Sequence, residues 1–420
     1  MKKILFFILV LLYTGCGMNV DQSDENATDT NVTVSNTSEA VQPQSELEYL
    51  NFLRNKAGMI SLASDDALKS AAENHAYYLY VNNTTGHYED ENNPGYTGYA
   101  PVDRALYAGY LSRFVLENVS NGQEDYKGSI DGLFSAIYHR FGFLSEDIDT
   151  IGIGIEDKNY VYDMGNSILN TLCGGDSFES AGSYYYDVCK DEDFKIEASE
   201  YLGAFDDIRK QNADVILWPY KDANDIPPAF YNEDPDPLPD YSVSGYPVSV
   251  KFNRYYFDSN ITLKTFKIFD ENGNEITNTR LLDKNTDPNG RFDEYEYALY
   301  PLDRLEWNTT YSAEVSYEYN SQDYTISWSF KTRDLGYPVY RITTSDETVY
   351  VDSNKTNAFY FVPANGDDVI TGYSYSYPGG VSVSAKMADN NTLLINVLGE
   401  SGDEINFEMN NGDKLKLIIK

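Results

Sequence analysis

The search for residues that could do chemistry begins with the histidines, because the 420 residues include only three. His139 lies in the segment LFSAIYHRF, where apolar side chains recur at helical spacing and predict one helix over residues 129–143. On a helical wheel His139 falls opposite Ile130, among small side chains. An imidazole above small residues is typical of the floor of a cleft, although a solvated surface histidine fits the wheel equally well.

Cys16 follows Lys2-Lys3, an apolar run and Gly15, in the layout of an export signal. The apolar run is too short to span a bilayer as a permanent helix. A small residue directly before the cysteine resembles the lipobox of bacterial lipoproteins, in which the cysteine is lipidated and becomes the new N-terminus. We therefore predict a lipoprotein signal peptide over 1–15 and lipidation at Cys16. A plain secretory signal is the alternative.

Cys173 and Cys189 are the other two cysteines of the sequence, since Cys16 is expected to carry the lipid. An exported protein folds in an oxidising compartment, so we expect the two to form a disulfide. No histidine or third cysteine lies near them in the sequence, and nothing about the pair indicates a metal site.

The charge of the chain restricts its partners. Acidic residues outnumber basic ones by 67 to 31, which gives a formal net charge of -36. Nucleic acid needs a basic footprint, so we expect no nucleic-acid partner. Electrostatic attachment to anionic lipid is disfavoured for the same reason, and membrane contact is expected through the lipid on Cys16. These features predict a protein of the cell envelope, anchored to a membrane on its periplasmic side or at the cell surface.

An acidic stretch over residues 285–296 has the oxygen spacing of a calcium loop. Its first position is Asn285 rather than an acid, Pro288 stiffens it, and no helical pattern flanks it. A connection within a β-hairpin is therefore the preferred interpretation.

The N-terminal half mixes helical patterns with two strands, at 150–155 and 160–164, and indicates an α+β domain. The second helix is expected to begin after Ser64 as its N-cap, and its apolar face includes His75, which we interpret as a packed structural histidine. Seven prolines between 218 and 247 then indicate a connector, and alternating segments with Asn-Gly turns follow. The predicted organisation is a disordered acidic tether (16–45), a domain with a C-terminal extension (46–217), a Pro-rich connector (218–247), an Ig-like β-sandwich (248–335) and a C-terminal β module (336–420).

Several short motifs follow one another in the helical region. They are Leu50-Asn51 with Arg54 and Gly58, Ala71-Ala72-x-x-His75-Ala76, Gly86-His87, Leu116-Glu117-Asn118-Val119 with Gly122, and Ala136-Ile137-Tyr138-His139-Arg140 followed by Ile151-Gly152-Ile153-Gly154. Together they resemble the CAP superfamily, also called the SCP domain, which includes cysteine-rich secretory proteins, antigen 5 and pathogenesis-related proteins. The resemblance covers about 46 to 165 and implies a CAP-type α-β-α sandwich, followed here by two all-β modules.

The resemblance also implies a cleft that gathers two histidines and acidic residues, which correspond here to His87, Glu117 and His139. A second acidic residue of the family has no clear counterpart, although Glu89 or Asp90 could take its place. Two neutral imidazoles and a carboxylate can hold a divalent metal such as zinc, with His87, His139 and Glu117 as ligands, or can shuttle a proton. Alternatively, these groups only bond to one another and brace the fold.

Three functions are compatible with these features. The first is a non-enzymatic, lipid-anchored envelope protein whose His/Glu cleft binds a small ligand, a lipid or a divalent metal. The second is a metal-dependent, peptidase-like hydrolase that acts in the envelope. Against it, the sequence offers no clear nucleophile, because a serine one helical turn before a histidine, such as Ser135 before His139, is common. The third is an adhesive or scaffolding protein whose β modules and 38 tyrosines contact proteins or glycans.

Overall fold

The computed structural model describes residues 43–176 and 182–420. The predicted signal peptide over 1–15, the lipidation site Cys16 and most of the tether over 16–45 lie outside the described residues. Within the described ranges, no helix is long and apolar enough to cross a membrane.

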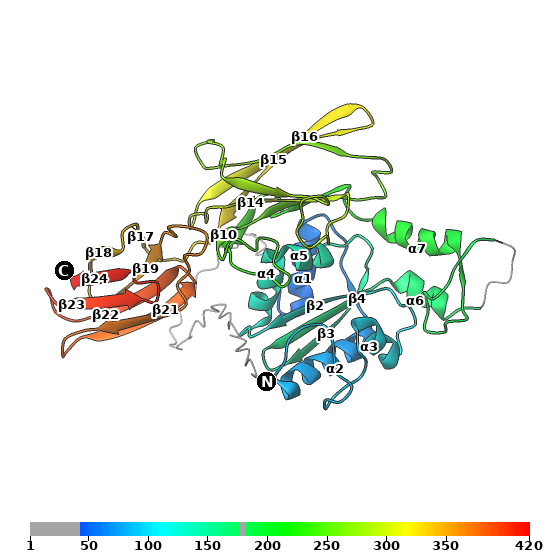
Figure 1. Cartoon of the computed structure of the whole chain (residues 1–420), viewed down its shortest axis with the longest axis horizontal. Coiled ribbons are helices and arrows are strands. Elements are labelled where there is room, and N and C mark those ends of the chain that lie inside the picture. Colours follow the sequence, from blue (N-terminus) through cyan, green and yellow to red (C-terminus); the bar gives the residue numbers. More distant parts are fainter. Residues whose placement is uncertain (1–42, 177–181) are drawn as a thin grey trace, which may run out of the picture.

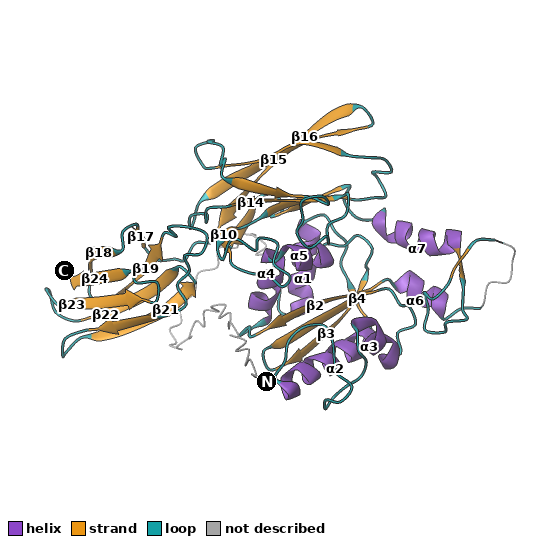
Figure 2. Ribbon diagram, viewed as in Figure 1, coloured by secondary structure: helices purple, strands orange, loops and turns teal. Residues whose placement is uncertain are grey.

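The N-terminal domain is a three-layer α-β-α sandwich (Figure 1). Its sheet has the strand order β1-β3-β4-β2, in which β1 runs parallel to β3 and the other pairs are antiparallel. Figure 2 shows α2 and α3 on one face of this sheet and α1, α4 and α5 on the other. The predicted α-β-α sandwich is confirmed. The bounds are β1 Ala63–Ser64, β2 Val115–Asn121, β3 Thr150–Glu156, β4 Asn159–Gly165, α1 Glu46–Lys56, α2 Asp66–Asn82, α3 Pro101–Ala108, α4 Tyr126–Ser135 and α5 Ile137–Phe143.

Helix α2 packs with its backbone directly on β3, and two glycines allow this approach. A Cβ added at Gly152 would lie 2.0 Å from the backbone of Leu68, and one at Gly154 would lie 2.1 Å from the backbone of Ala72. Atoms cannot come so close without displacing the helix, so the alternating Ile-Gly pattern of β3 is required by the contact with α2.

Side-chain caps start the first two helices. Ser45 accepts a hydrogen bond from the backbone N–H of Glu48 at the start of α1. Asp65 does the same at the start of α2, where its Oδ1 accepts from the N–H groups of the second and third helical residues at 2.9 Å each. The prediction of Ser64 as this cap is wrong, because Ser64 belongs to β1 and pairs with Ile151.

The single helix predicted over 129–143 is in fact two helices, α4 and α5. Ala136 separates them with an extended conformation, φ −79° and ψ 118°. A helical wheel drawn through all of these residues is therefore wrong, because the direction of the side chains is reset at Ala136.

The apolar residues of the two helices are buried as expected, but they face two different neighbours. Ile130 and Leu133 of α4 belong to a core cluster that includes residues of β4. Ile137 and Phe141 of α5 pack with residues that follow the N-terminal domain, among them Phe230. The two helices therefore contribute their apolar side chains to two different core clusters.

A β-sandwich of two four-stranded sheets follows, with strand orders β13-β14-β11-β7 and β12-β15-β16-β8. We call it the first β module. Its strands are β7 Val215–Trp218, β8 Ala223–Ile226, β11 Val248–Phe252, β12 Thr262–Phe269, β13 Thr279–Leu282, β14 Glu296–Pro301, β15 Thr310–Tyr319 and β16 Gln322–Thr332, and a small pair consists of β9 Ala229–Phe230 and β10 Ser244–Gly245.

The Pro-rich stretch 218–247 is not the extended connector that the sequence predicted. It contains β8, β9 and β10 and the last residue of β7. The prolines do not prevent this: Pro219 directly follows β7, and Pro227 and Pro228 lie between β8 and β9. They stand at strand ends, where a missing backbone N–H costs no ladder hydrogen bond.

The N-terminal domain and the first β module share one hydrophobic core. A single cluster of buried residues runs from Leu50 of α1 through Phe134 of α4 to Trp218 and Phe330 of the β-sandwich. The rings of Phe134 and Trp218 stack with centroids 4.1 Å apart. The two parts are therefore packed as one unit rather than joined by a free linker.

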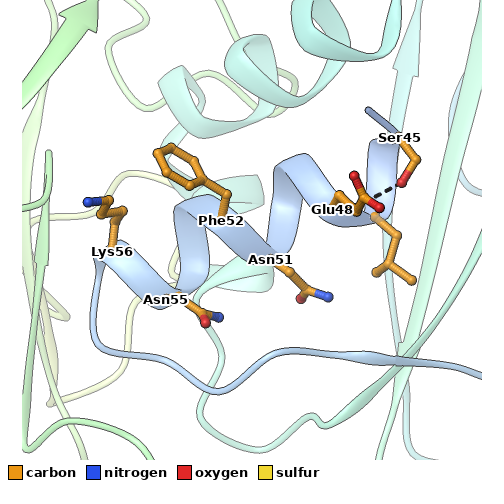
Figure 3. Close-up of a pocket in the computed structure, with 7 residues that line it drawn as sticks. Ser45, Glu48, Asn51, Phe52, Asn55 and Lys56 are labelled. Atoms are coloured by element: carbon orange, nitrogen blue, oxygen red, sulfur yellow. Dashed lines mark hydrogen bonds between the residues drawn. The ribbon is translucent and has the colours of Figure 1, made fainter. Parts of the chain in front are cut away.

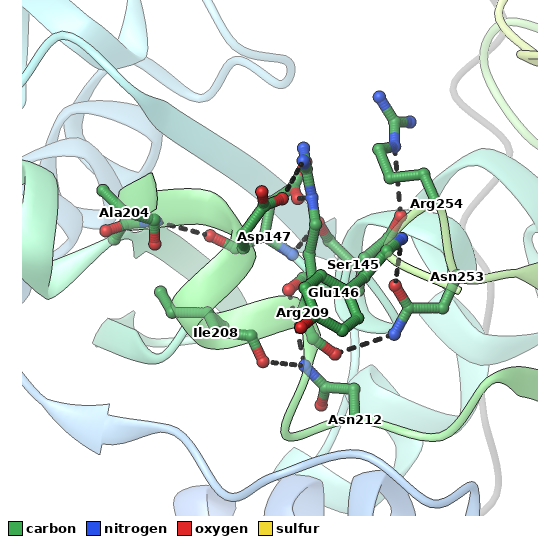
Figure 4. A network of polar contacts seen from close by, with 12 residues as sticks. Ser145, Glu146, Asp147, Ala204, Ile208, Arg209, Asn212, Asn253 and Arg254 are labelled. Carbon is green, nitrogen blue, oxygen red and sulfur yellow. Dashed lines mark hydrogen bonds and ion pairs between the residues drawn. The ribbon is translucent and has the colours of Figure 1, made fainter. Parts of the chain in front are cut away.

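Polar contacts close the same interface (Figure 4). Glu146, which follows α5, is buried and pairs with Lys251 of β11 at 3.0 Å and with Arg254 at 3.3 Å. Burial alone would raise the pKa of Glu146, but the charges of Lys251 and Arg254 hold it below its usual value. Beside it, Asp147 pairs with Arg209 at 2.5 Å. Removing one partner from such a buried group would leave an unpaired charge.

Helix α7, which ends at Arg209, forms an extension of the N-terminal domain together with α6 and a short strand pair. The bounds are α6 Ser167–Cys173, β5 Tyr184–Tyr185, β6 Ile196–Glu197 and α7 Ala198–Arg209. The predicted disulfide between Cys173 and Cys189 is present, with Cα atoms 5.4 Å apart. It joins the end of α6 to the segment that packs on Ser112.

The C-terminal β module also has two four-stranded sheets, with orders β17-β19-β22-β21 and β18-β24-β23-β20 around its own core. Its strands are β17 Val339–Ile342, β18 Asp346–Val351, β19 Lys355–Phe361, β20 Tyr373–Ser376, β21 Ser382–Asp389, β22 Thr392–Leu398, β23 Glu404–Met409 and β24 Lys414–Ile419. Trp307 of the first β module donates to Thr392 at 3.0 Å, and Arg304 forms an ion pair with Asp389. The prediction of two all-β modules is confirmed.

Candidate functional site

Glu117 of β2 holds the first predicted site histidine. His87 lies in the loop after α2, and its Nδ1 is 2.8 Å from Oε1 of Glu117. The second oxygen of Glu117 accepts from Arg104 of α3 at 2.5 Å. Burial alone would raise the pKa of Glu117, but the hydrogen bond from His87 and the charge of Arg104 hold it below its usual value.

His139 has a carboxylate partner that the sequence did not indicate. Its Nδ1 lies 2.7 Å from Oε1 of Glu233, in the segment between β9 and β10. The same oxygen accepts from the backbone N–H groups of Tyr138 and His139, at 2.9 and 3.2 Å, where α5 begins. Glu233 therefore orients both the imidazole and the start of its helix, although it lies outside the region of family resemblance.

The two imidazoles lie next to each other. Their centroids are 6.3 Å apart and their planes differ by 22°, so the rings stack. The side chain of His87 is 36% exposed and that of His139 is 15% exposed, so solvent reaches both. Each Nδ1 is occupied by a carboxylate, and neither Nε2 has a hydrogen-bond partner among the described residues. The structure thus brings His87, Glu117 and His139 together, as predicted, and adds Glu233.

Strand β2 positions both histidines through two successive residues. Glu117 bonds the imidazole of His87, and Asn118 donates from Nδ2 to the backbone carbonyl of His139 at 2.8 Å. Gly142 of α5 lies against this amide, since a Cβ there would come within 2.9 Å of Asn118 Oδ1. The Glu-Asn pair of the sequence motif therefore fixes two chain segments that are far apart in the sequence.

His75 is a buried structural histidine, as predicted, and it supports the loop of His87. Its Nδ1 lies 2.8 Å from Glu89, and its Nε2 lies 2.9 Å from the carbonyl of Gly86. Arg104 donates to the carbonyl of His87 at 2.9 Å. Glu89 therefore serves His75 and does not act as the second acidic residue beside the imidazoles.

Asp163 of β4 lies behind Glu117, to which it is paired in the β2–β4 register. It is fully buried, and neither of its carboxylate oxygens has a hydrogen-bond partner among the described residues. Burial, and after it the charge of Glu117, raise the pKa of Asp163 well above its usual value. A neutral carboxyl group is the state that this position favours. No spacing in the sequence pointed to Asp163.

The donors fit a zinc site poorly. Each imidazole tied to a carboxylate at Nδ1 resembles the usual arrangement of a metal-binding histidine. However, both oxygens of Glu117 already accept hydrogen bonds, from His87 and Arg104. In the part of the chain that the structure describes, no group of three or more His, Cys, Asp or Glu side chains is arranged to hold a metal. Protein zinc sites use three or four such ligands, so two nitrogens alone fall short.

Nucleophilic catalysis has little support from the geometry. Ser135 ends α4, and its hydroxyl donates to the carbonyl of Gly132 at 2.7 Å instead of to His139. The two described cysteines form the disulfide.

The acidic stretch 285–296 connects β13 to β14, which pair antiparallel, so the preferred interpretation as a hairpin connection is confirmed.

A cavity of about 720 Å³ lies along a single helix, α1, and gathers no histidine (Figure 3). Its walls include Ser45, Phe52 and Lys56, with the cap contact between Ser45 and Glu48 visible at one end. This position separates it from the imidazoles, and we assign it no role.

Comparison with known proteins agrees with the fold. Residues 47–173 match the model of the cysteine-rich secretory protein family, CAP. No curated protein matches the chain. Three solved structures are similar to parts of it. An extracellular SCP-domain protein from Bacillus anthracis has 23% identity over 28% of this chain and 38% of its own length, with a TM-score of 0.26. An outer surface protein from Borrelia burgdorferi has 22% identity over 28% of this chain and 87% of its own, with a TM-score of 0.24. A tandem of titin Ig domains has 11% identity over 49% of this chain and 96% of its own, with a TM-score of 0.17.

The chain therefore spans little more than a third of the Bacillus anthracis protein, at 38%. The family match covers the same segment that forms the α-β-α sandwich, with its motifs on α1, α2, β2, α5 and β3. Residues 47–173 of this chain thus form a domain that matches the CAP family.

Proposed function

We propose that this chain is a lipid-anchored protein of the cell envelope whose two His–Glu pairs bind a small polar ligand without turnover. The observation that carries the proposal is the geometry of the imidazoles. Their rings stack 6.3 Å apart, both Nδ1 atoms are held by buried glutamates, and both Nε2 atoms are unpartnered among the described residues.

The carboxylates prepare the imidazoles for binding. A glutamate that accepts the Nδ1–H fixes the tautomer in which Nε2 carries a lone pair. Two such acceptors, side by side, suit a ligand with two N–H or O–H donors. Because Glu117 and Glu233 already hold the rings in place, little side-chain freedom is lost when the ligand binds.

The same geometry argues for binding rather than hydrolysis. A hydrolase would need an activated nucleophile or a metal with an open position. Among the described residues, no serine or cysteine forms a hydrogen bond with either imidazole, and both oxygens of Glu117 already accept hydrogen bonds.

Three features support a location in the envelope. The sequence before Cys16 resembles a lipoprotein signal, the disulfide between Cys173 and Cys189 is typical of an oxidising compartment, and the charge of -36 disfavours a nucleic-acid partner. The lipid on Cys16 would hold the folded part near the membrane through the acidic tether.

Nitrogen NMR of the two imidazoles tests the proposal, with a library of small diols and diamides as the probes. A fragment that binds should shift the Nε2 signals of both His87 and His139, and should be recovered unchanged. His87→Ala and His139→Ala should each weaken its binding at least tenfold. Tyr107→Ala is the matched control, because this exposed α3 side chain lies in the same domain and should leave binding unchanged. Stoichiometric zinc in purified protein, together with chelator-sensitive cleavage of peptide or wall polymer, would overturn the proposal in favour of a hydrolase.

A further inference from the structure

A cavity of about 680 Å³ lies where the three parts of the described chain meet. Its walls come from α4 and the residues before it, from the β8–β9 connection, from the edge of the first β module, and from the turn after β21 in the C-terminal module. This volume falls within the range of about 300–1,000 Å³ that is typical of small-ligand sites. None of the three site residues predicted from the family resemblance lines it.

Ion pairs that cross between the parts hold the walls in place. Arg333 of the first β module lies 3.3 Å from Asp131 of α4 and 2.7 Å from Asp225 of β8. Arg304 is paired with Asp389 at the end of β21. The cavity is therefore preformed, and three of its carboxylates already have a guanidinium partner.

The other two carboxylates of the cavity are also engaged. Asp125 caps α4 by accepting from the N–H of Gly128 at 2.8 Å, and Asp334 accepts from the N–H of Gly336 at 2.8 Å. Across the whole lining, five aspartates stand against two cations, Lys127 and Arg333. An anionic ligand would meet this surplus of negative charge, whereas a cation would find most of the carboxylate oxygens already paired.

Lys127 of the lining forms no ion pair within the described ranges and lies over the Tyr49 ring, and the other unpartnered groups include three neutral side chains. The side-chain amides of Gln123, Asn232 and Asn390 line the cavity, and none of them forms a hydrogen bond with another described residue. Each carboxamide offers both donors and an acceptor. Tyr126 and Tyr231 add partly exposed rings to the same lining.

We propose that this cavity binds a neutral oligosaccharide. Sugar hydroxyls both donate and accept hydrogen bonds, which matches the three free amides, and the apolar C–H face of a sugar ring can pack on a tyrosine ring. The inference does not depend on the two imidazoles, since it uses a different set of residues. It assigns the joint between the CAP domain and the β modules a recognition role of its own.

Isothermal titration of the mature full chain with cellotetraose, maltotetraose and N-acetylchitotetraose tests this proposal. At least one of these sugars should bind, and Asn232→Ala and Asn390→Ala should each weaken its binding at least tenfold. Both amides lack structural partners, so neither variant should lose stability. Asn272→Ala, at an exposed turn remote from the cavity lining, is the matched control and should bind as the parent does.

The outcomes separate clearly. Binding that is lost with Asn232 and Asn390 but kept in the Asn272 variant supports the proposal. Absence of binding by all three sugars overturns it, as does sugar binding that survives both amide substitutions. Tighter binding of hexalysine or inorganic phosphate than of any sugar also overturns it, because the charges of the lining would then decide recognition.

Discussion

Phe134→Ala tests whether the CAP domain and the first β module unfold together. Phe134 lies on α4, is 1% exposed, and stacks on Trp218 of β7 with ring centroids 4.1 Å apart. Its ring also contacts Phe143, at 5.4 Å. Truncation of a buried phenylalanine costs about 3–5 kcal/mol, because the transfer free energy is lost and a cavity remains. That is a large part of the roughly 5–15 kcal/mol by which such proteins are stable.

Urea unfolding with two probes measures the effect. The seven helices of the described residues all lie between Glu46 and Arg209, so helical circular dichroism reports on the CAP domain and its extension. The three tryptophans, Trp218, Trp307 and Trp328, report on the first β module. With an m-value of about 3 kcal/mol per molar, a loss of about 3–5 kcal/mol lowers the midpoint by roughly 1–1.7 M urea. Both probes should shift by the same amount.

Phe52→Ala is the matched control, since Phe52 is 39% exposed on α1 and its loss should shift the midpoint far less. If Phe134→Ala moves the dichroism transition and leaves the tryptophan transition at its original midpoint, the shared core does not couple the two parts. The description of one packed unit would then be refuted.

Three further predictions concern other parts of the chain. Cys16→Ser should move the protein from the membrane to the soluble fraction, because a chain of charge -36 has no second means of membrane attachment, and continued need for detergent would contradict lipidation. Reduction of Cys173–Cys189 should lower the free energy of unfolding by about 3 kcal/mol, and thiol labelling before reduction should find neither cysteine free. Asp163→Asn should stabilise the protein at neutral pH. The pKa of Asp163 is raised in the fold. Its contribution to the stability of the parent is therefore fully present below the unfolded carboxyl pKa of about 4, and it is lost as the pH rises through the folded pKa. The variant's advantage in melting temperature should therefore shrink toward acid pH, and an advantage that is constant with pH would refute the reasoning.

The sequence predicted those features that depend on the residue types within one element or on the few available cysteines. The apolar face of α2 and the Ile-Gly repeat of β3 were readable because the close contact between them requires these residue types. The pairing of Cys173 with Cys189 was predictable because the third cysteine, Cys16, was expected to carry a lipid. The sequence analysis found His87, Glu117 and His139 through family motifs. The resemblance implies a fold in which these distant segments lie together.

Other features depend on contacts that no local pattern records. The break at Ala136 replaces one predicted helix by two, and α5 then turns the face of Ile137 toward the first β module. Glu233 lies in a stretch of acids and prolines that is typical of a linker, and only the tertiary fold places it beside His139. Asp163 gave no signal either, because a single acid in a strand is ordinarily a solvated residue.

These contacts make the histidine pair a property of more than the CAP domain. Residues 47–173 contain His87, Glu117 and His139, but the carboxylate that orients His139 comes from beyond them. The stretch that contains Glu233 also covers α5, because its Phe230 and Leu238 pack with Ile137. A chain that ended after the family match would therefore expose the apolar face of α5 and leave the Nδ1 of His139 without its partner. The first β module is thus part of the site, because it supplies the packing and the charge that hold one of the two imidazoles in place.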